Sequence, residues 1–137
     1  MVVCHVDAGS CNGCELEIHA LNGTQYNIEG VGVKFAASPR HADILLATGP
    51  VFAHLKTALR PTYEATPDPK WVVAVGDCAA TGGIFGESYA SRGRVENVIP
   101  VDVVTSASVM EFTPSNGLRI LTDRRADERA LHVLPPP

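Results

Sequence analysis

The sequence reads Ala8-Gly-Ser-Cys-Asn-Gly-Cys-Glu-Leu-Glu-Ile18 where a short apolar segment gives way to a helical pattern. The apolar residues 2–6 predict a buried strand, and residues 15–21 predict a helix with acids in its first turn. Cys11 and Cys14 therefore fall in a strand-to-helix loop. In an α/β sheet such a loop lies at the carboxyl end of the strand, where ligands bind.

The rest of the chain repeats this alternation of strand and helix. The pattern predicts strands over 2–6, 31–37, 44–47, 71–75 and 98–104, helices over 15–21, 51–59 and 118–134, a connector over 62–69 and a loop over 76–83. Strands alternating with helices indicate βαβ units, a mainly parallel sheet and helices on both faces. A chain of 137 residues suits one such α/β domain.

A third cysteine follows the apolar strand predicted over 71–75. Residues 76–83 read Gly-Asp-Cys-Ala-Ala-Thr-Gly-Gly, so Cys78 leaves the sheet at the same edge as Cys11 and Cys14. Three thiolates from two loops match the needs of an iron–sulfur cluster or another soft metal. The glycine-rich loop fits neither G-x-G-x-x-G nor G-x-x-x-x-G-K-[ST], so nucleotide binding is not predicted.

A Cys-x-x-Cys pair by itself leaves two other chemistries open. A zinc knuckle usually has four closed ligands, and a thioredoxin-like dithiol would not need Cys78. Neither explains the glycine-rich loop around Cys78. Cys4 lies inside the first strand and is expected to be a buried, inert thiol. Glu15 and Glu17 are expected as acids of the first helical turn, although a carboxylate beside a redox centre could also pass protons.

Composition limits the partners and the setting. The formal net charge of -4 and the lack of a lysine or arginine block argue against a nucleic-acid partner. The apolar runs are far shorter than the ~20 residues that span a bilayer, so membrane association is expected only through partner subunits. Met1 leads directly into the first strand, which predicts no signal peptide and a cytosolic setting. In that setting four cysteines favour metal or redox chemistry over structural disulfides.

Several separated stretches occur in the order typical of one family, from about Val6 to Val104. These stretches are Cys11-Asn-Gly-Cys-Glu-Leu-Glu-Ile18, Ala37-Ser-Pro-Arg-His-Ala-Asp-Ile-Leu-Leu-Ala-Thr-Gly-Pro-Val51, Ala74-Val-Gly-Asp-Cys-Ala-Ala-Thr-Gly-Gly-Ile-Phe85 and Val98-Ile-Pro-Val-Asp102. Through them the chain resembles the small subunit of membrane-bound, energy-converting nickel–iron hydrogenases and formate hydrogenlyases. It is also similar to the 20 kDa subunit of respiratory complex I that carries the terminal cluster.

The resemblance implies a flavodoxin-like domain over residues 1–104 that binds one 4Fe-4S cluster through Cys11, Cys14 and Cys78. It also implies a large catalytic subunit as the packing partner and further iron–sulfur subunits as electron partners. The protein would transfer electrons, and by itself it would not turn over substrate. It would be a cytoplasmic protein, peripheral on the inner face of the cytoplasmic membrane. Partner subunits would connect it to the membrane subunits. Glu17 aligns with a family acid near the cluster, which suggests proton transfer.

The sequence departs from the family after Val104. The family has a Pro-Gly-Cys-Pro-Pro segment with the fourth cysteine ligand, whereas these positions hold Ser-Ala-Ser-Val-Met over 106–110. Ser108 would be a poorer iron ligand because its hydroxyl must lose a proton of far higher pKa. The expected outcomes are a 4Fe-4S cluster completed by Ser108, water or a partner residue, a 3Fe-4S cluster, or no cluster.

Two alternatives to electron transfer through a cluster therefore stay open. One is a structural subunit that has lost its cluster, and the other is a dithiol redox protein that uses Cys11 and Cys14. Residues 105–137 form an atypical tail, which we interpret as a change of reading frame or a terminal replacement.

Overall fold

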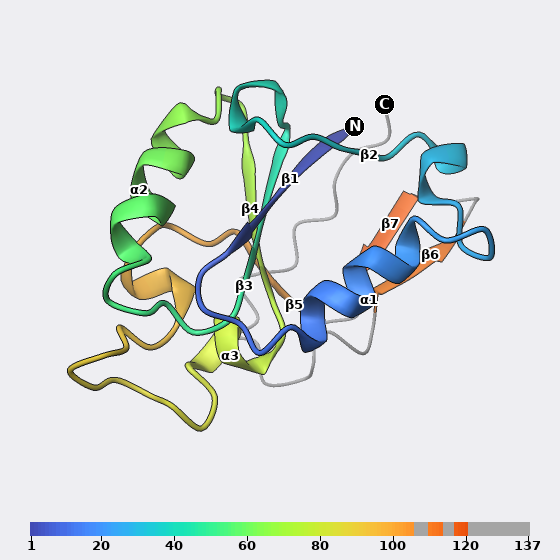
Figure 1. The fold of residues 1–137 in the computed structure, drawn as a ribbon. Helices are drawn as coiled ribbons and strands as arrows, with labels where there is room; N and C mark the ends of the chain where they lie inside the picture. Colours follow the sequence, from blue (N-terminus) through green and yellow to red (C-terminus); the bar gives the residue numbers. More distant parts are fainter. Residues whose placement is uncertain (106–109, 114–116, 121–137) are drawn as a thin grey trace.

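The computed structural model describes residues 1–105, 110–113 and 117–120 (Figure 1). The main sheet has five parallel strands in the order β2-β1-β3-β4-β5. Its strands are β1 (Val2–Asp7), β2 (Lys34–Phe35), β3 (Ile44–Thr48), β4 (Trp71–Val75) and β5 (Val103–Thr105). The helices are α1 (Gly13–Leu21), α2 (Lys56–Ala65) and α3 (Asp77–Thr81), with 3₁₀ turns η1 (Ile28–Val31), η2 (Pro39–His41) and η3 (Val95–Asn97). A separate antiparallel pair consists of β6 (Met110–Thr113) and β7 (Gly117–Ile120).

The main sheet is covered on both faces, with α1 and α2 on opposite sides (Figure 1). Ile18 and Leu21 of α1 pack on one face, and Leu59 of α2 packs on the other. All five residues of β3 are buried, as expected for a central parallel strand that reads as a continuous apolar run. This strand order and the helices on both faces confirm the predicted flavodoxin-like α/β fold.

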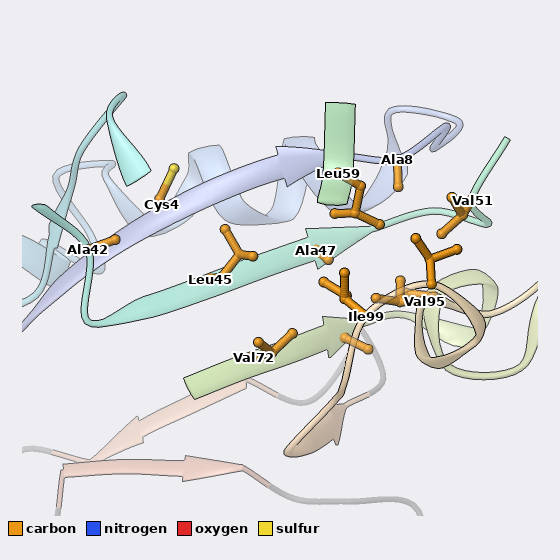
Figure 2. Packing of buried hydrophobic residues seen from close by; sticks show 13 residues of the cluster. Cys4, Ala8, Ala42, Leu45, Ala47, Val51, Leu59, Val72, Val95 and Ile99 are labelled. Carbon is orange, nitrogen blue, oxygen red and sulfur yellow. The ribbon is translucent and has the colours of Figure 1, made fainter. Parts of the chain in front are cut away.

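The α2 face holds the apolar layer drawn in Figure 2. Leu45 and Ala47 of β3 and Val72 of β4 meet Leu59 of α2 there. Val95 and Ile99 extend the same layer toward the carboxyl ends of the strands. Among the helices of the described ranges, none is both long and apolar enough to cross a lipid bilayer.

Helix boundaries were predicted less well than strand positions. The helix expected over 51–59 instead forms as α2, which continues through Pro61 and so occupies part of the connector expected over 62–69. Pro61 is exposed, so the loss of one helical hydrogen bond occurs at the solvent side. Burial of Leu59 and packing of Tyr63 on the same layer stabilise the helix on both sides of the proline.

Two expected strands are shorter than predicted. The strand expected over 31–37 is reduced to β2, because Val31 belongs to η1 and Gly32 turns the chain in a left-handed conformation. The strand expected over 98–104 begins only at Val103. The residues before β5 form a turn that buries the apolar side chains Val95, Val98 and Ile99.

Two further expectations were wrong in part. The loop expected over 76–83 contains the short helix α3, in which Ala79 is buried against the core. The helix expected over 118–134 is contradicted at its start, because residues 118–120 belong to β7; residues 121–134 lie outside the described residues. The expectation of a serine ligand at Ser108 also falls outside them.

We predict that Leu45→Ala lowers the free energy of unfolding by about 2–5 kcal/mol, because Leu45 is fully buried and the truncation leaves a cavity. Leu16→Ala is the matched control, since Leu16 is 65% exposed, and it should change this free energy by no more than about 0.5 kcal/mol. Urea unfolding followed by the fluorescence of Trp71 measures both. Equal losses in the two variants would contradict the assigned core.

Candidate functional site

Four strands end level with one another at the carboxyl edge of the sheet. The register pairs Asp7 of β1 with Thr48 of β3, Thr48 with Val75 of β4, and Val75 with Thr105 of β5. The loops that carry the cysteines leave the sheet from Asp7 and Val75. Both cysteine-bearing segments therefore begin at the same height along the sheet, at its carboxyl edge.

The Cys-x-x-Cys loop is fixed by the residue that ends β1. The Asp7 carboxylate accepts hydrogen bonds of 2.7 Å from the backbone N–H groups of Gly9 and Ser10. The Ser10 hydroxyl in turn accepts a 3.2 Å hydrogen bond from the N–H of Asn12, which is left-handed and precedes α1. Cys11 is exposed in this loop, whereas Cys14 lies within the first turn of α1 and is half-buried.

The turn after β3 packs against the backbone of the Cys-x-x-Cys loop. Gly49 has a positive φ of 77°, and a Cβ there would collide with the backbone nitrogen of Ser10. The backbone N–H of Ala8 donates to the carbonyl of Thr48 at 2.9 Å, and the N–H of Phe52 donates to the carbonyl of Ala8 at 3.0 Å. The close backbone approach at Gly49 thus sets the position of the Cys-x-x-Cys loop.

Cys78 lies in the first turn of α3, which follows β4. A Cβ on Gly83, which has a positive φ of 55°, would lie 2.9 Å from the Cys78 sulfur, so a glycine leaves that sulfur free space. The Sγ atom of Cys14 lies 3.9 Å from the carbonyl oxygen of Val75 at the end of β4. Cys14 is therefore next to the strand end from which the Cys78 helix emerges.

The electrostatics of the thiols reflect their proximity. Burial raises the pKa of Cys14, and the negative charges of Glu15, Cys11, Cys78 and Asp77 raise it further. Burial also raises the pKa of Cys78, followed by the effects of Cys11 and Asp77. A positively charged metal group beside these sulfurs would offset both effects. All four cysteines are free thiols, and Cys4 is buried in β1 as predicted.

The described residues at this edge match an iron–sulfur cluster in donor chemistry and do not form a compact site for a single metal ion. Within residues 1–105, 110–113 and 117–120, no group of three His, Cys, Asp or Glu side chains is arranged to hold a metal ion. An iron–sulfur cluster would be held by cysteine thiolates from several positions of the chain and not by one compact set of mixed donors. The donor chemistry fits, because three free thiols lie in the loop after β1 and in the first turns of α1 and α3, and Gly83 leaves space where a side chain would crowd the Cys78 sulfur.

A buried polar group beside the cysteines joins three elements. The Thr48 hydroxyl of β3 donates a 2.6 Å hydrogen bond to Oε1 of Glu15, the residue after Cys14 in α1. Nε2 of His5 in β1 lies 3.0 Å from the Thr48 hydroxyl and 3.6 Å from the same carboxylate oxygen. Burial alone would raise the pKa of Glu15, but hydrogen bonds from the Ser10 and Thr48 hydroxyls outweigh it, so the pKa lies below its ordinary value.

The sequence did not single out this group as a unit. Glu17, the acid named as a proton carrier, is exposed, whereas Glu15 is buried. The buried residues of α1 are Glu15, Ile18 and Leu21, spaced three apart, and the apolar Leu16 is exposed instead. The signal available in the sequence was the position of Thr48 at the end of an apolar strand, level with the cysteine loops.

The fold is a flavodoxin-like domain, and the carboxyl edge of its parallel sheet carries three free cysteines. The family model for the NADH–ubiquinone oxidoreductase 20 kDa subunit matches residues 11–110. The chain belongs to this family, which confirms the resemblance found in the sequence.

Two of the curated relatives are named as subunits of a hydrogenase and of a formate hydrogenlyase. The chain is 50% identical over 101 residues to a probable membrane-bound hydrogenase subunit of Pyrococcus furiosus, covering 74% of this chain and 60% of the relative. It is 43% identical over 101 residues to formate hydrogenlyase subunit 7 of Escherichia coli, covering 74% of this chain and 40% of the relative. The chain thus spans less than two thirds of the length of each.

Solved structures agree with the fold. A chain of an archaeal membrane-bound sulfane sulfur reductase matches with a TM-score of 0.65 and 34% identity, covering 77% of this chain and 58% of that one. A chain of an NAD⁺-reducing nickel–iron hydrogenase matches with a TM-score of 0.58 and 20% identity, covering 80% of this chain and 85% of that one. At that identity the second likeness concerns the fold alone.

We predict that Gly49→Ala destabilises the protein by more than about 2 kcal/mol, because it combines a strained positive φ with a collision against the Ser10 backbone. Gly32→Ala is the matched control. Gly32 has a similar φ of 87° and no atoms within 4 Å of the added Cβ, so it should cost only the strain of about 1 kcal/mol. Urea unfolding compares them, and equal costs would contradict the proposed support of the cysteine loop.

The lowered pKa of Glu15 predicts an acid-sensitive contribution to stability. Because the folded pKa lies below the ordinary value of 4.5, this contribution is present above pH 4.5 and is lost as the pH falls through the folded pKa. Glu15→Gln should therefore flatten the decline in unfolding free energy with acid relative to the parent. Chemical denaturation at a series of pH values from 3 to 7 measures it. A parent and variant with parallel pH profiles would contradict the assigned hydrogen bonds.

Proposed function

We propose that this protein is an electron-transfer subunit that carries an iron–sulfur cluster beside the catalytic site of a multi-subunit hydrogenase-like or complex I-like oxidoreductase. The observation that carries the proposal is that three free thiols lie in the two segments that follow β1 and β4 at one edge of the sheet. Membership of the 20 kDa subunit family supports it. Thiolates are the usual protein ligands of such clusters.

In this proposal Cys11, Cys14 and Cys78 hold a 4Fe-4S cluster. The cluster would supply one-electron transfer, and the protein would not turn over substrate alone. The chain's own residues fix the ligands: Asp7 holds the Cys-x-x-Cys loop, and Gly83 leaves space at the sulfur of Cys78. The unit that performs this task is residues 1–104.

The fourth position needs a donor other than a cysteine of this chain, because the one further cysteine, Cys4, is buried in mid-strand and pairs with Leu45. The candidates are Ser108, water or a residue of a partner subunit. A 3Fe-4S cluster needs only three cysteines and is the second candidate for the cofactor.

We propose a large catalytic subunit as the packing partner, with other iron–sulfur subunits exchanging electrons and membrane subunits reached indirectly. The names of the hydrogenase relatives support a multi-subunit assembly. Ile84 and Phe85, which follow Gly83 in the segment after α3, are 95% and 49% exposed, so apolar surface is available beside the site for a partner. The proposed location is cytoplasmic, peripheral on the inner face of the membrane.

Two rival functions carry specific consequences. A structural subunit without a cluster would keep the partner surface but would not depend on Cys78. A dithiol redox protein would need a thiolate stabilised at neutral pH, whereas burial raises the pKa of Cys14.

Proton transfer by the exposed Glu17 stays a prediction.

The deciding experiment is low-temperature electron paramagnetic resonance on the anaerobically isolated complex, before and after dithionite. We expect a signal that disappears in Cys78→Ala and persists in Cys4→Ala, the control that removes a thiol away from the site. A reduced 4Fe-4S signal or an oxidised 3Fe-4S signal would each identify the cofactor. If neither depends on Cys78, the electron-transfer proposal fails and the domain is a scaffold.

A further inference from the structure

A buried carboxylate stands beside the proposed ligands and is not needed as a ligand itself. Glu15 directly follows Cys14 and is only 8% exposed. Its Oε1 accepts the hydrogen bond from Thr48, while its Oε2 is buried and has no hydrogen-bond partner among the described residues. The carboxylate is therefore a charged group held in a buried position beside Cys14, with one of its two oxygens left unpaired in the described part of the chain.

The hydrogen bonds around Glu15 have one consistent direction. A carboxylate only accepts, so Thr48 uses its single hydroxyl proton to donate to Glu15. His5 Nε2, which lies 3.0 Å from the Thr48 oxygen, must then be the donor in that contact. The imidazole therefore carries a proton on Nε2.

His5 does not neutralise Glu15 at neutral pH. Desolvation lowers the pKa of His5, and the opposing effects of Glu15 and Asp7 do not overcome it, so its pKa stays below 6.5. The 3.6 Å approach between His5 and Glu15 is then a contact of a neutral ring with an anion. The group as a whole keeps one negative charge in a buried position next to Cys14.

We propose that Glu15 is a fixed negative charge that lowers the reduction potential of the cluster held by Cys11, Cys14 and Cys78. This inference rests on the proposed function. Reduction adds one electron to the cluster, from a neighbouring iron–sulfur centre or from dithionite in a titration. The added negative charge is opposed by an anion already fixed in a low-dielectric position. The charge of Glu15 is close to the site, since Glu15 directly follows Cys14 in the first turn of α1 and its carboxylate is held in place by Thr48.

Glu29 offers a matched control for this effect. It carries the same carboxylate, lies in η1 and is exposed to solvent. Glu15→Gln and Glu29→Gln therefore remove the same formal charge from the chain. Solvent screens the exposed site far more than the buried one, so the two variants separate a local electrostatic effect from a change in net charge.

The test is a redox titration of the Cys78-dependent paramagnetic signal in the complex isolated from the parent and each variant. We expect the midpoint potential to shift to a more positive value in Glu15→Gln and to stay near the parent value in Glu29→Gln. An unchanged potential in Glu15→Gln, or an equal shift in both variants, would overturn the inference. Absence of a Cys78-dependent signal in the parent would overturn the proposed function itself, and the inference with it.

Two further variants test the inference if Glu15→Gln does not assemble the cluster. Glu15→Ser removes the same charge with a smaller side chain, and a parent-like potential in it would overturn the inference. Glu15→Asp keeps the charge and should keep a potential closer to that of the parent. If both neutral variants lose the signal and only Glu15→Asp retains it, the role is structural and the electrostatic inference is overturned.

Discussion

Parallel pairing with strand ends at one level is the constraint on which the site depends. The register places Asp7, Thr48, Val75 and Thr105 side by side at the carboxyl edge. Each of the first three then contributes to the cysteine site: Asp7 holds the Cys-x-x-Cys loop, Thr48 binds Glu15, and the Val75 carbonyl lies next to the Cys14 sulfur. A register slip of one residue would move these side chains to the opposite face of the sheet.

The fold could be predicted because its strands are encoded locally, whereas its helix ends are not. Apolar runs such as 44–47 and 71–75 are readable without tertiary information, since a strand buried on both faces is apolar throughout. The helix α2 passes Pro61 because the buried Leu59 and the partly buried Tyr63 stabilise it on either side. Such packing overrides a local helix-breaking signal and cannot be read from the sequence.

The candidate site was predicted as a set of cysteines but not as an electrostatic environment. The spacing of Cys11 and Cys14, and the position of Cys78 after an apolar strand, were enough to place three thiols at one edge. Glu15 and Glu17 look equivalent in sequence as first-turn acids. Only the rotation of α1 against the sheet, which buries Glu15 with Ile18 and exposes Leu16, distinguishes them.

Thr48 connects the stability of the sheet with the chemistry at its edge. Its backbone carbonyl accepts a hydrogen bond from Ala8, and its side chain holds the carboxylate of Glu15. Hydrogen bonds to this carboxylate outweigh the effect of burial on its pKa, so a charged group stays at the edge of the sheet although its Oε2 has no partner among the described residues. If the proposed cluster occupies this edge, the same charge would act directly on the electron that the cluster accepts. The hydrogen bond that orders the end of β3 against α1 would then also set the electrostatics of the proposed site.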